Sequence, residues 1–203
     1  MIKKITILVT ILFTLNGLSQ SFSYGPMIGY SAYDLEIDGP LQGDGAFSGL
    51  NFGAFGEYQI NKSFGAKANL LYSRMNETSY SISGEKIFQD VSLTTLQLHG
   101  LLKFDVNSEY NKGFYFIGGL RMTNILNIQE DNSVNDPEEF YKKTVVGAML
   151  GFGVNFLKHY SLEVIPERNL SNTIDFNNDK ARNYGIYLNF NVNLGSILSS
   201  KKE

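Results

Sequence analysis

The sequence of 203 residues contains no cysteine and no tryptophan. The absence of cysteine excludes disulfides, thiolate chemistry and a lipid-modified cysteine behind a leader segment. No apolar run approaches the roughly 18 residues that a helix needs to cross a membrane, which excludes a helical membrane protein. The length fits one domain, and no shift in composition indicates a second.

The first 19 residues predict a signal peptide. Lys3 and Lys4 supply the positive charge, Ile5–Leu15 is a short apolar run, and small residues precede an expected cleavage between Ser19 and Gln20. Removing this segment leaves 15 of the 17 basic residues against 20 acidic ones, a formal charge of −5. That balance argues against a nucleic-acid partner, which needs a basic surface. An exported chain of this size without disulfides must be stabilised by burial or by a membrane.

Eight segments of the remaining chain alternate between apolar and polar residues with the period of a β-strand. In Ser48–Ile60, for example, Leu50 and Phe52 share one face and Asn51 and Glu57 the other. The predicted strands are Phe22–Tyr33, Ser48–Ile60, Phe64–Met75, Val91–Asp105, Phe114–Ile128, Thr144–Phe156, Tyr160–Asn169 and Asn183–Leu194.

The connections between these strands also alternate. Turns at Asn61–Ser63, Leu157–His159 and Val106–Gly113 separate longer loops near 34–47, 78–88, 129–142 and 173–182. Short turns at one end and long loops at the other are typical of an outer-membrane barrel with both termini in the periplasm. A soluble sandwich or a lipocalin-like barrel is the alternative, because it alternates too.

The polarity of the second face separates these two folds. A soluble barrel closes around apolar side chains, whereas a membrane barrel turns its apolar face to lipid. Here the second face of each strand carries glycine, serine, asparagine, glutamine and charged residues, and aromatic residues gather near the strand ends, although tryptophan is missing from them. We therefore predict an all-β fold, an eight-stranded antiparallel up-and-down transmembrane barrel over residues 20–198, with a short periplasmic tail at 199–203.

The sequence resembles the PorT-like outer-membrane β-barrel domain family of Bacteroidetes-type Gram-negative bacteria over about residues 20–195. The resemblance is carried by Leu96–Phe104, Gly113–Gly119, Gly147–Asn155 and the final strand. It departs from the family pattern at Gln97, His99 and Gly100, where the family usually has Glu, Pro and Leu. The resemblance implies a small barrel in the outer membrane.

The final strand carries a motif that looks like the signal read by the barrel assembly machinery. Asn183, Gly185, Leu188 and Phe190 follow its order of polar residue, glycine and two apolar residues. An ordinary amphipathic strand also produces such a match. Its position in the last strand favours the assembly signal.

The inward faces of the predicted strands carry ionisable residues of both signs. Because a charge inside a barrel is costly unless paired, we expect a network of ion pairs and hydrogen bonds that fills the lumen. An interior enclosed by eight strands is only just wide enough for side chains. The expected network comprises Glu57, Lys67, His99, Lys103, Asp105, Arg121, Glu163 and Glu167.

Two functional alternatives remain at this point. The same residues could line a narrow porin-like path for ions or small solutes. His159 and Ser161 have the His-x-Ser spacing of barrels that modify lipid A, but they lie at a predicted periplasmic turn and lack a convincing third residue. We expect no enzyme activity, no cofactor and no metal. We expect a protein that acts through its loops or through contacts with lipid, lipopolysaccharide, the assembly machinery or a secretion complex.

The long loops are acidic, and oxygen-rich clusters can hold Ca²⁺ or bridge to lipopolysaccharide through divalent ions. None of them matches the EF-hand pattern, so solvated loops are the default interpretation. The acidic residues are Asp34, Glu36, Asp38, Asp44, Glu130, Asp131, Asp136, Glu138, Glu139, Asp175 and Asp179.

Overall fold

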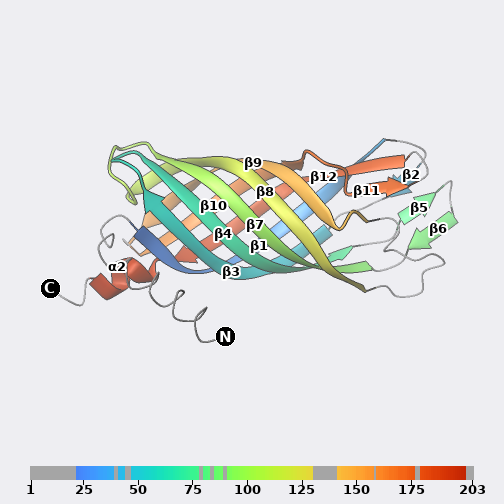
Figure 1. The fold of residues 1–203 in the computed structure, drawn as a ribbon, viewed down its shortest axis with the longest axis horizontal. Helices are drawn as coiled ribbons and strands as arrows, with labels where there is room; N and C mark the ends of the chain where they lie inside the picture. The colour runs from blue at the N-terminus through green and yellow to red at the C-terminus, as the bar shows by residue number, and fades with distance from the viewer. Residues whose placement is uncertain are drawn as a thin grey trace, which may run out of the picture.

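Eight long antiparallel strands form a closed barrel in which the first strand pairs with the last (Figure 1). The computed structural model describes residues 22–38, 41–43, 47–77, 80–82, 85–88, 91–129, 141–157, 159–176 and 179–199. The strands follow one another around the wall in chain order, as up-and-down topology requires. The predicted signal peptide lies outside the described residues. The eight strands in order are β1 (Phe22–Asp38), β3 (Phe47–Gln59), β4 (Phe64–Glu77), β7 (Val91–Asp105), β8 (Gly113–Gln129), β9 (Thr144–Phe156), β10 (Tyr160–Asn169) and β12 (Asp179–Val192).

The wall is apolar outside, and the predicted polar and charged residues face inward beside buried apolar ones, which confirms the predicted orientation of the strand faces. Along β7, buried and exposed residues alternate through most of the strand, with Gln97, His99 and Lys103 buried and Leu98 and Leu102 exposed. A row of exposed leucines is unfavourable in water, whereas in a bilayer the same row faces hydrocarbon. The alternation therefore suits a lipid solvent.

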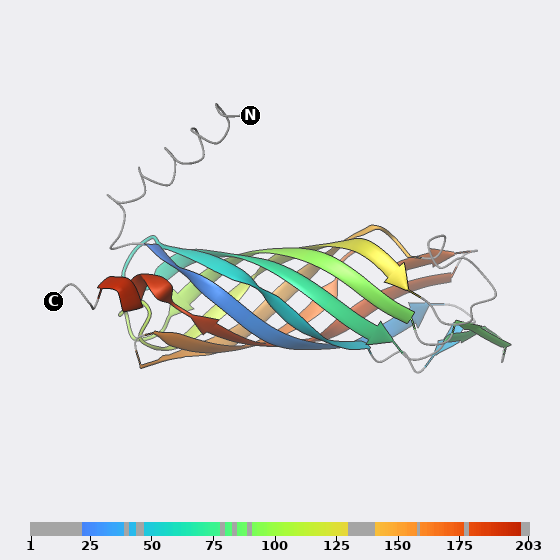
Figure 2. The ribbon, with the colours of Figure 1, turned by 90° about the horizontal axis from the view of Figure 1, so that it is seen from below.

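The two ends of the barrel differ (Figures 1 and 2). At one end, which we call the turn end, the strands are joined by the short connections at 60–63, 106–112 and 157–159. At the other, the loop end, β1 and β12 pair as far as Asp38 and Lys180, beyond the strands predicted there. Four short strands stand at the loop end: β2 (Leu41–Gly43), β5 (Tyr80–Ile82) and β6 (Glu85–Phe88) form a separate sheet, and β11 (Ile174–Phe176) pairs with β12.

These additions were not predicted, because segments of three or four residues are too short for periodicity to identify. They lie within the segments that the sequence assigned to loops. Their strands are held by backbone pairing, between β2 and β5 and between β5 and β6. Part of the loop end is therefore ordered as short β-strands.

The last strand ends two residues earlier than predicted, and helix α2 (Leu194–Ser199) follows it. Asn193 causes the change. Its backbone N–H donates to the carbonyl of His159 (2.7 Å), and its Oδ1 accepts the N–H of Ser196 (3.2 Å), as a helix N-cap does. No helix among the described residues is long and apolar enough to span a bilayer.

Aromatic side chains form a girdle outside the wall near the turn end. Phe64 and Phe104 lie 4.9 Å apart between ring centroids, and Tyr160 stacks on Phe190 at 5.8 Å. Rings of this kind favour the boundary between hydrocarbon and headgroups. The predicted concentration of aromatic residues at the strand ends is thus present at this end.

Candidate functional site

All eight ionisable residues predicted for the lumen are buried inside the barrel, none with more than 6% of its surface exposed. The reason is the strand period: each occupies an inward position on its strand, between neighbours that face outward and are mostly apolar. The structure divides them into two groups. Glu57, Lys67, Lys103, Asp105 and Glu163, with Tyr115, form the turn-side cluster. His99, Arg121 and Glu167, with Tyr33, Gln97 and Tyr187, form the loop-side cluster.

The turn-side cluster joins opposite walls of the barrel. Lys67 on β4 forms an ion pair with Glu163 on β10, four strands away around the wall in either direction. The same Glu163 Oε1 accepts a hydrogen bond from the Tyr115 hydroxyl (2.9 Å). One carboxylate thus binds a lysine across the lumen and a tyrosine two strands away.

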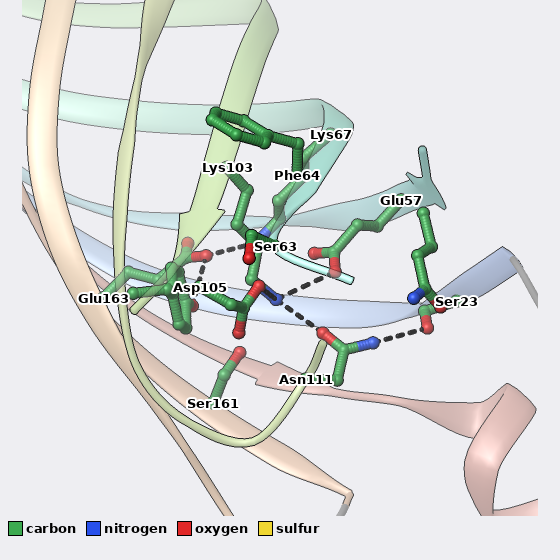
Figure 3. Close-up of polar contacts among 12 residues, drawn as sticks. Ser23, Glu57, Ser63, Phe64, Lys67, Lys103, Asp105, Asn111, Ser161 and Glu163 are labelled. Carbon is green, nitrogen blue, oxygen red and sulfur yellow. Dashed lines mark hydrogen bonds and ion pairs between the residues drawn. The ribbon is translucent and has the colours of Figure 1, made fainter. Parts of the chain in front are cut away.

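Lys103 is the second centre of this cluster (Figure 3). Its Nζ donates to Glu57 Oε1 (2.9 Å) and lies 3.7 Å from Asp105 Oδ2. The ring centroids of Tyr110 and Tyr115 lie 4.6 Å and 4.3 Å from the same nitrogen, within range of cation–π attraction. Two carboxylates and two rings therefore surround one buried ammonium group.

The turn between β7 and β8 folds back into the mouth of the barrel, which the sequence did not indicate. Asn111 accepts a hydrogen bond from Lys103 and donates from Nδ2 to Ser23 Oγ on β1 (3.0 Å), as Figure 3 shows. Tyr110 lies against Gly65, where a Cβ would come within 1.7 Å of its hydroxyl. Burial beside Glu57 raises the pKa of the Tyr110 hydroxyl above its ordinary value, so the phenol stays protonated. The turn covers the turn-side cluster.

A water-sized cavity of about 20 Å³ remains beside this turn. Glu57, Asn111, Ser161 and Asn191 are among the residues that line it. A volume of this size holds about one water molecule.

The loop-side cluster is built around Arg121. Its Nε donates to Glu167 Oε2 (2.9 Å), and its terminal nitrogens bond Thr123 and Asn169 as well as Glu167. Such a fork places several donors in one plane and suits a carboxylate. The guanidinium carbon also lies 5.9 Å from the ring centroid of Tyr33 on β1, the strand opposite β8.

A chain of hydrogen bonds crosses the lumen at the same level. Tyr33 donates to Tyr187, and Tyr187 donates to Gln97 Oε1 (2.7 Å), which joins β12 to the opposite strand β7. His99 lies beside this chain, with Nε2 3.3 Å from Gln97 Oε1 and its ring edge-on to Tyr187. His99 and Arg121 thus lie against the groups that bridge the lumen, and Glu167 is joined to them through Arg121.

Apolar side chains fill the lumen between the clusters and towards the loop end, and the sequence interpretation missed them. Leu71, Ile117 and Ile165 are fully buried among the polar groups. Nearer the loops the interior is lined by a second set that contains few charges. This set comprises Phe47, Met75, Val91, Leu93, Ile125, Tyr141, Ile174 and Ala181.

Both residues of the His-x-Ser motif have hydrogen-bond partners outside the motif. His159 Nδ1 lies 2.8 Å from Ser196 Oγ on α2, whereas Ser161 Oγ accepts from Asn191 Nδ2 (2.9 Å). Each side chain has a partner other than its expected one. The contacts of these residues join the last strand and α2 to the barrel.

The acidic loops are described only in part. The Tyr184 hydroxyl donates to Asp34 (2.7 Å), and Glu36 pairs with Arg168 on the outer surface. Within the described ranges, no three acidic or histidine side chains are grouped so as to hold a metal ion. The remaining acidic residues lie outside the described residues or outside the described side chains.

The predicted assembly motif lies on β12, which closes the barrel against β1. Asn183 points inward and is buried, while Leu188 faces outward with Ile186. Gly185 pairs with Tyr33, and a Cβ on it would meet that residue's backbone and ring. Phe190 joins the aromatic girdle.

Among solved structures, Neisserial surface protein A shares this fold. It is 14% identical, with a TM-score of 0.51, 84% of this chain covered and 96% of that one. Ail of Yersinia pestis, in complex with sucrose octasulfate, is 15% identical with a TM-score of 0.49, and the match covers 84% of this chain and 99% of that one. OprG of Pseudomonas aeruginosa is 16% identical with a TM-score of 0.46, and the match covers 85% of this chain and 94% of that one. No curated protein matches the chain. The family model described as "Outer membrane protein beta-barrel domain" matches residues 5–193. The chain therefore belongs to the outer membrane protein beta-barrel domain family, which places it in the outer membrane of a Gram-negative bacterium.

Proposed function

We propose that this protein is a non-enzymatic outer-membrane barrel whose lumen is closed by its own side chains and whose loop end meets partners at the cell envelope. The observation that carries the proposal is the set of contacts between opposite strands. Lys67 with Glu163 and Gln97 with Tyr187 span the full width of the lumen at two levels. A solute would have to break both contacts to pass.

The orientation and the partner class are part of the proposal. Short turns at one end and long connections at the other favour periplasmic turns and an exposed loop end. The small sheet of β2, β5 and β6 gives that end an ordered surface for adhesion or for a secretion complex, and the PorT-like resemblance favours the complex. The proposal also includes export by the signal peptide, assembly through the β12 motif and contact with lipopolysaccharide in the membrane.

Single-channel recording in planar bilayers tests the closed lumen. We expect no stepwise conductance from the wild-type protein at any applied voltage. Glu109→Ala, which alters an exposed ion pair of the β7–β8 turn with Lys112, should behave in the same way. Stepwise conductance of the wild-type protein would overturn the proposal and establish the channel.

The channel is the second candidate because a specific observation favours it. The lumen carries buried lysines, an arginine and carboxylates, and the water-sized cavity lies at the turn-side mouth. If water threads the barrel, these charges would select the ions that pass. The same recordings at two salt concentrations would give that selectivity.

The surface role is tested by removing the ordered sheet at the loop end. Replacing residues 80–88 with a glycine–serine linker should abolish crosslinking to an envelope partner in intact cells. The barrel should still shift its migration in SDS gels on heating, which reports that it folds. Unaltered crosslinking by the linker variant would contradict a role for this sheet.

The non-enzymatic role is tested by the composition of lipid A. Altered lipid A in cells that lack the protein, restored by the wild type but not by His159→Ala, would contradict this role.

A further inference from the structure

Each short turn presents an exposed apolar side chain at the turn end of the barrel. Ile60 follows β3, Val106 follows β7 and Leu157 follows β9, and all three are exposed. Turns that extend into water usually carry polar residues and glycine. Three apolar residues at the same end of the barrel indicate that these turns do not simply extend into water.

Leu157 is the clearest of the three. It is 76% exposed, and its φ of 51° lies in the left-handed region, which a branched side chain occupies at an energetic cost. Asparagine or glycine would accept this conformation more readily. A strained and largely exposed leucine gains little from packing within the barrel, and this points to a contact outside it.

Helix α2 adds a second apolar surface beside these turns. Ser196 faces the barrel, since its Oγ contacts His159 Nδ1 at 2.8 Å, and Gly195 lies close to Tyr24 on β1. Leu194 and Leu198 are one helical turn apart, on the face opposite Ser196, and both are exposed. The barrel thus holds α2 with its leucine face outward. The helix itself lies beside the start of β1 (Figure 2).

These residues lie just beyond the aromatic girdle. Val106 is two residues past Phe104, and Leu157 directly follows Phe156. At a rise of about 3.3 Å per residue, they lie within about 7 Å of the girdle along the chain. The headgroup layer on each side of a bilayer is about 5–8 Å thick.

We propose that Ile60, Val106, Leu157, Leu194 and Leu198 form an interfacial collar that binds the headgroup–acyl boundary of the leaflet at the turn end. The occupant is phospholipid rather than a protein, because the collar continues the lipid-facing wall without a polar break: Phe104 leads to Val106, Phe156 leads to Leu157, and Tyr24 lies beside α2. This inference depends on membership of the outer-membrane family and not on the closed lumen.

The absence of tryptophan gives a direct test. Single tryptophans at Leu157 and at Leu198 would each be the only indole in the protein. The variants are reconstituted in vesicles of phosphatidylethanolamine and phosphatidylglycerol, with lipids brominated near the glycerol or near the chain end. Leu98→Trp, in the exposed wall of β7 six residues from Phe104, is the control for a deep lipid position, and Glu109→Trp, at the tip of the β7–β8 turn, is the control for water.

We expect L157W and L198W to be quenched most by bromines near the glycerol and to emit at wavelengths between those of the two controls. Emission and iodide quenching equal to those of Glu109→Trp would overturn the collar, and would be the result if the surface binds a protein instead. Heat-modifiable migration verifies the fold of each variant, and Leu194→Trp replaces Leu198→Trp if that variant fails to fold. Channel recordings play no part in this readout, so it can fail or succeed independently of the proposed function.

Discussion

Lys67 and Glu163 form an ion pair across the lumen, although their strands β4 and β10 lie on opposite walls and 96 residues separate them in the sequence. Gln97 and Tyr187 repeat this relationship one level nearer the loops. The backbone ladder alone would hold each strand only to its two neighbours. These contacts therefore join opposite strands of the barrel to each other, in addition to filling the interior.

The ion pair of Lys67 and Glu163 should show strong coupling in a double-mutant cycle. Glu163→Gln keeps an acceptor for Tyr115 but leaves Lys67 without its counter-charge, and Lys67→Met leaves the carboxylate unpaired. Each single change should lower the free energy of unfolding by roughly 3–5 kcal/mol, because it leaves one buried charge uncompensated. The double variant should cost much less than the sum, since it buries no charge.

Urea unfolding in detergent micelles measures this cycle. Glu109→Gln is the matched control, since its pair with Lys112 is exposed, and it should change the midpoint little. Strictly additive effects of the two interior substitutions would show that the pair does not interact in the folded protein.

Two glycines offer a matched test of lumen packing. A Cβ on Gly153 would lie 2.4 Å from Cζ of Tyr115, whereas one on Gly100 would meet no atom within 4 Å. Gly153→Ala should displace Tyr115 from Glu163 and destabilise the barrel by about 1–3 kcal/mol. Gly100→Ala should be neutral or slightly stabilising, because alanine loses less backbone entropy in a strand. Equal melting by heat-modifiable gel migration would contradict a tightly packed interior.

The sequence was sufficient to predict the wall but not the contacts inside it. Period-two alternation placed Glu57, Lys67 and Lys103 on inward faces, and all three are inside. Which of them pair depends on the stagger between strands, and alternation within one strand carries no information about that stagger. The pairing of Lys67 with Glu163 rather than with its neighbour Glu57 therefore emerged only from the three-dimensional structure.

The apolar interior and the folded turn were missed for related reasons. Ile117 and Ile165 share their strand faces with glycine and charged residues, so the inward faces of these strands are polar on average. A glycine on an inward face also leaves room for a large side chain from another strand, as Gly153 does for Tyr115. Tyr110 and Asn111 enter the mouth from a polar turn, and a polar turn gives no local sign of which way it folds.

Arg121→Lys should be far from conservative. Arginine reaches Glu167, Asn169 and Thr123 from one planar group, whereas a lysine ammonium is a single point that cannot reach all three. Loss of these charge-assisted hydrogen bonds should destabilise the barrel by roughly 2–4 kcal/mol. Arg74→Lys, on the outer surface and bonded only to Gln129 among the contacts described, is the control. A midpoint in urea unchanged by Arg121→Lys would show that the fork is unimportant.

The closure of the turn-side mouth should depend on the Asn111 amide. Asn111 has a φ of 60°, so Asn111→Gly keeps the backbone conformation and removes only the bonds to Lys103 and Ser23. Asn111→Ala removes the same bonds and adds strain, and should destabilise the protein by about 1 kcal/mol more than glycine does.

The same change should expose the mouth. Because the chain has no cysteine, Ser23→Cys provides a unique thiol beside the turn, and its labelling by a small aqueous maleimide measures access. We expect slow labelling with Asn111 present and labelling at least several-fold faster with Asn111→Gly, because the turn then loses its hydrogen bond from Lys103 in β7, the attachment that remains once Ser23→Cys has replaced the hydroxyl on β1. The control Ser108→Cys, at an exposed position of the same turn, should react at the same rate in both backgrounds. Equal labelling of Ser23→Cys with and without Asn111→Gly would mean that Tyr110 alone keeps the mouth closed.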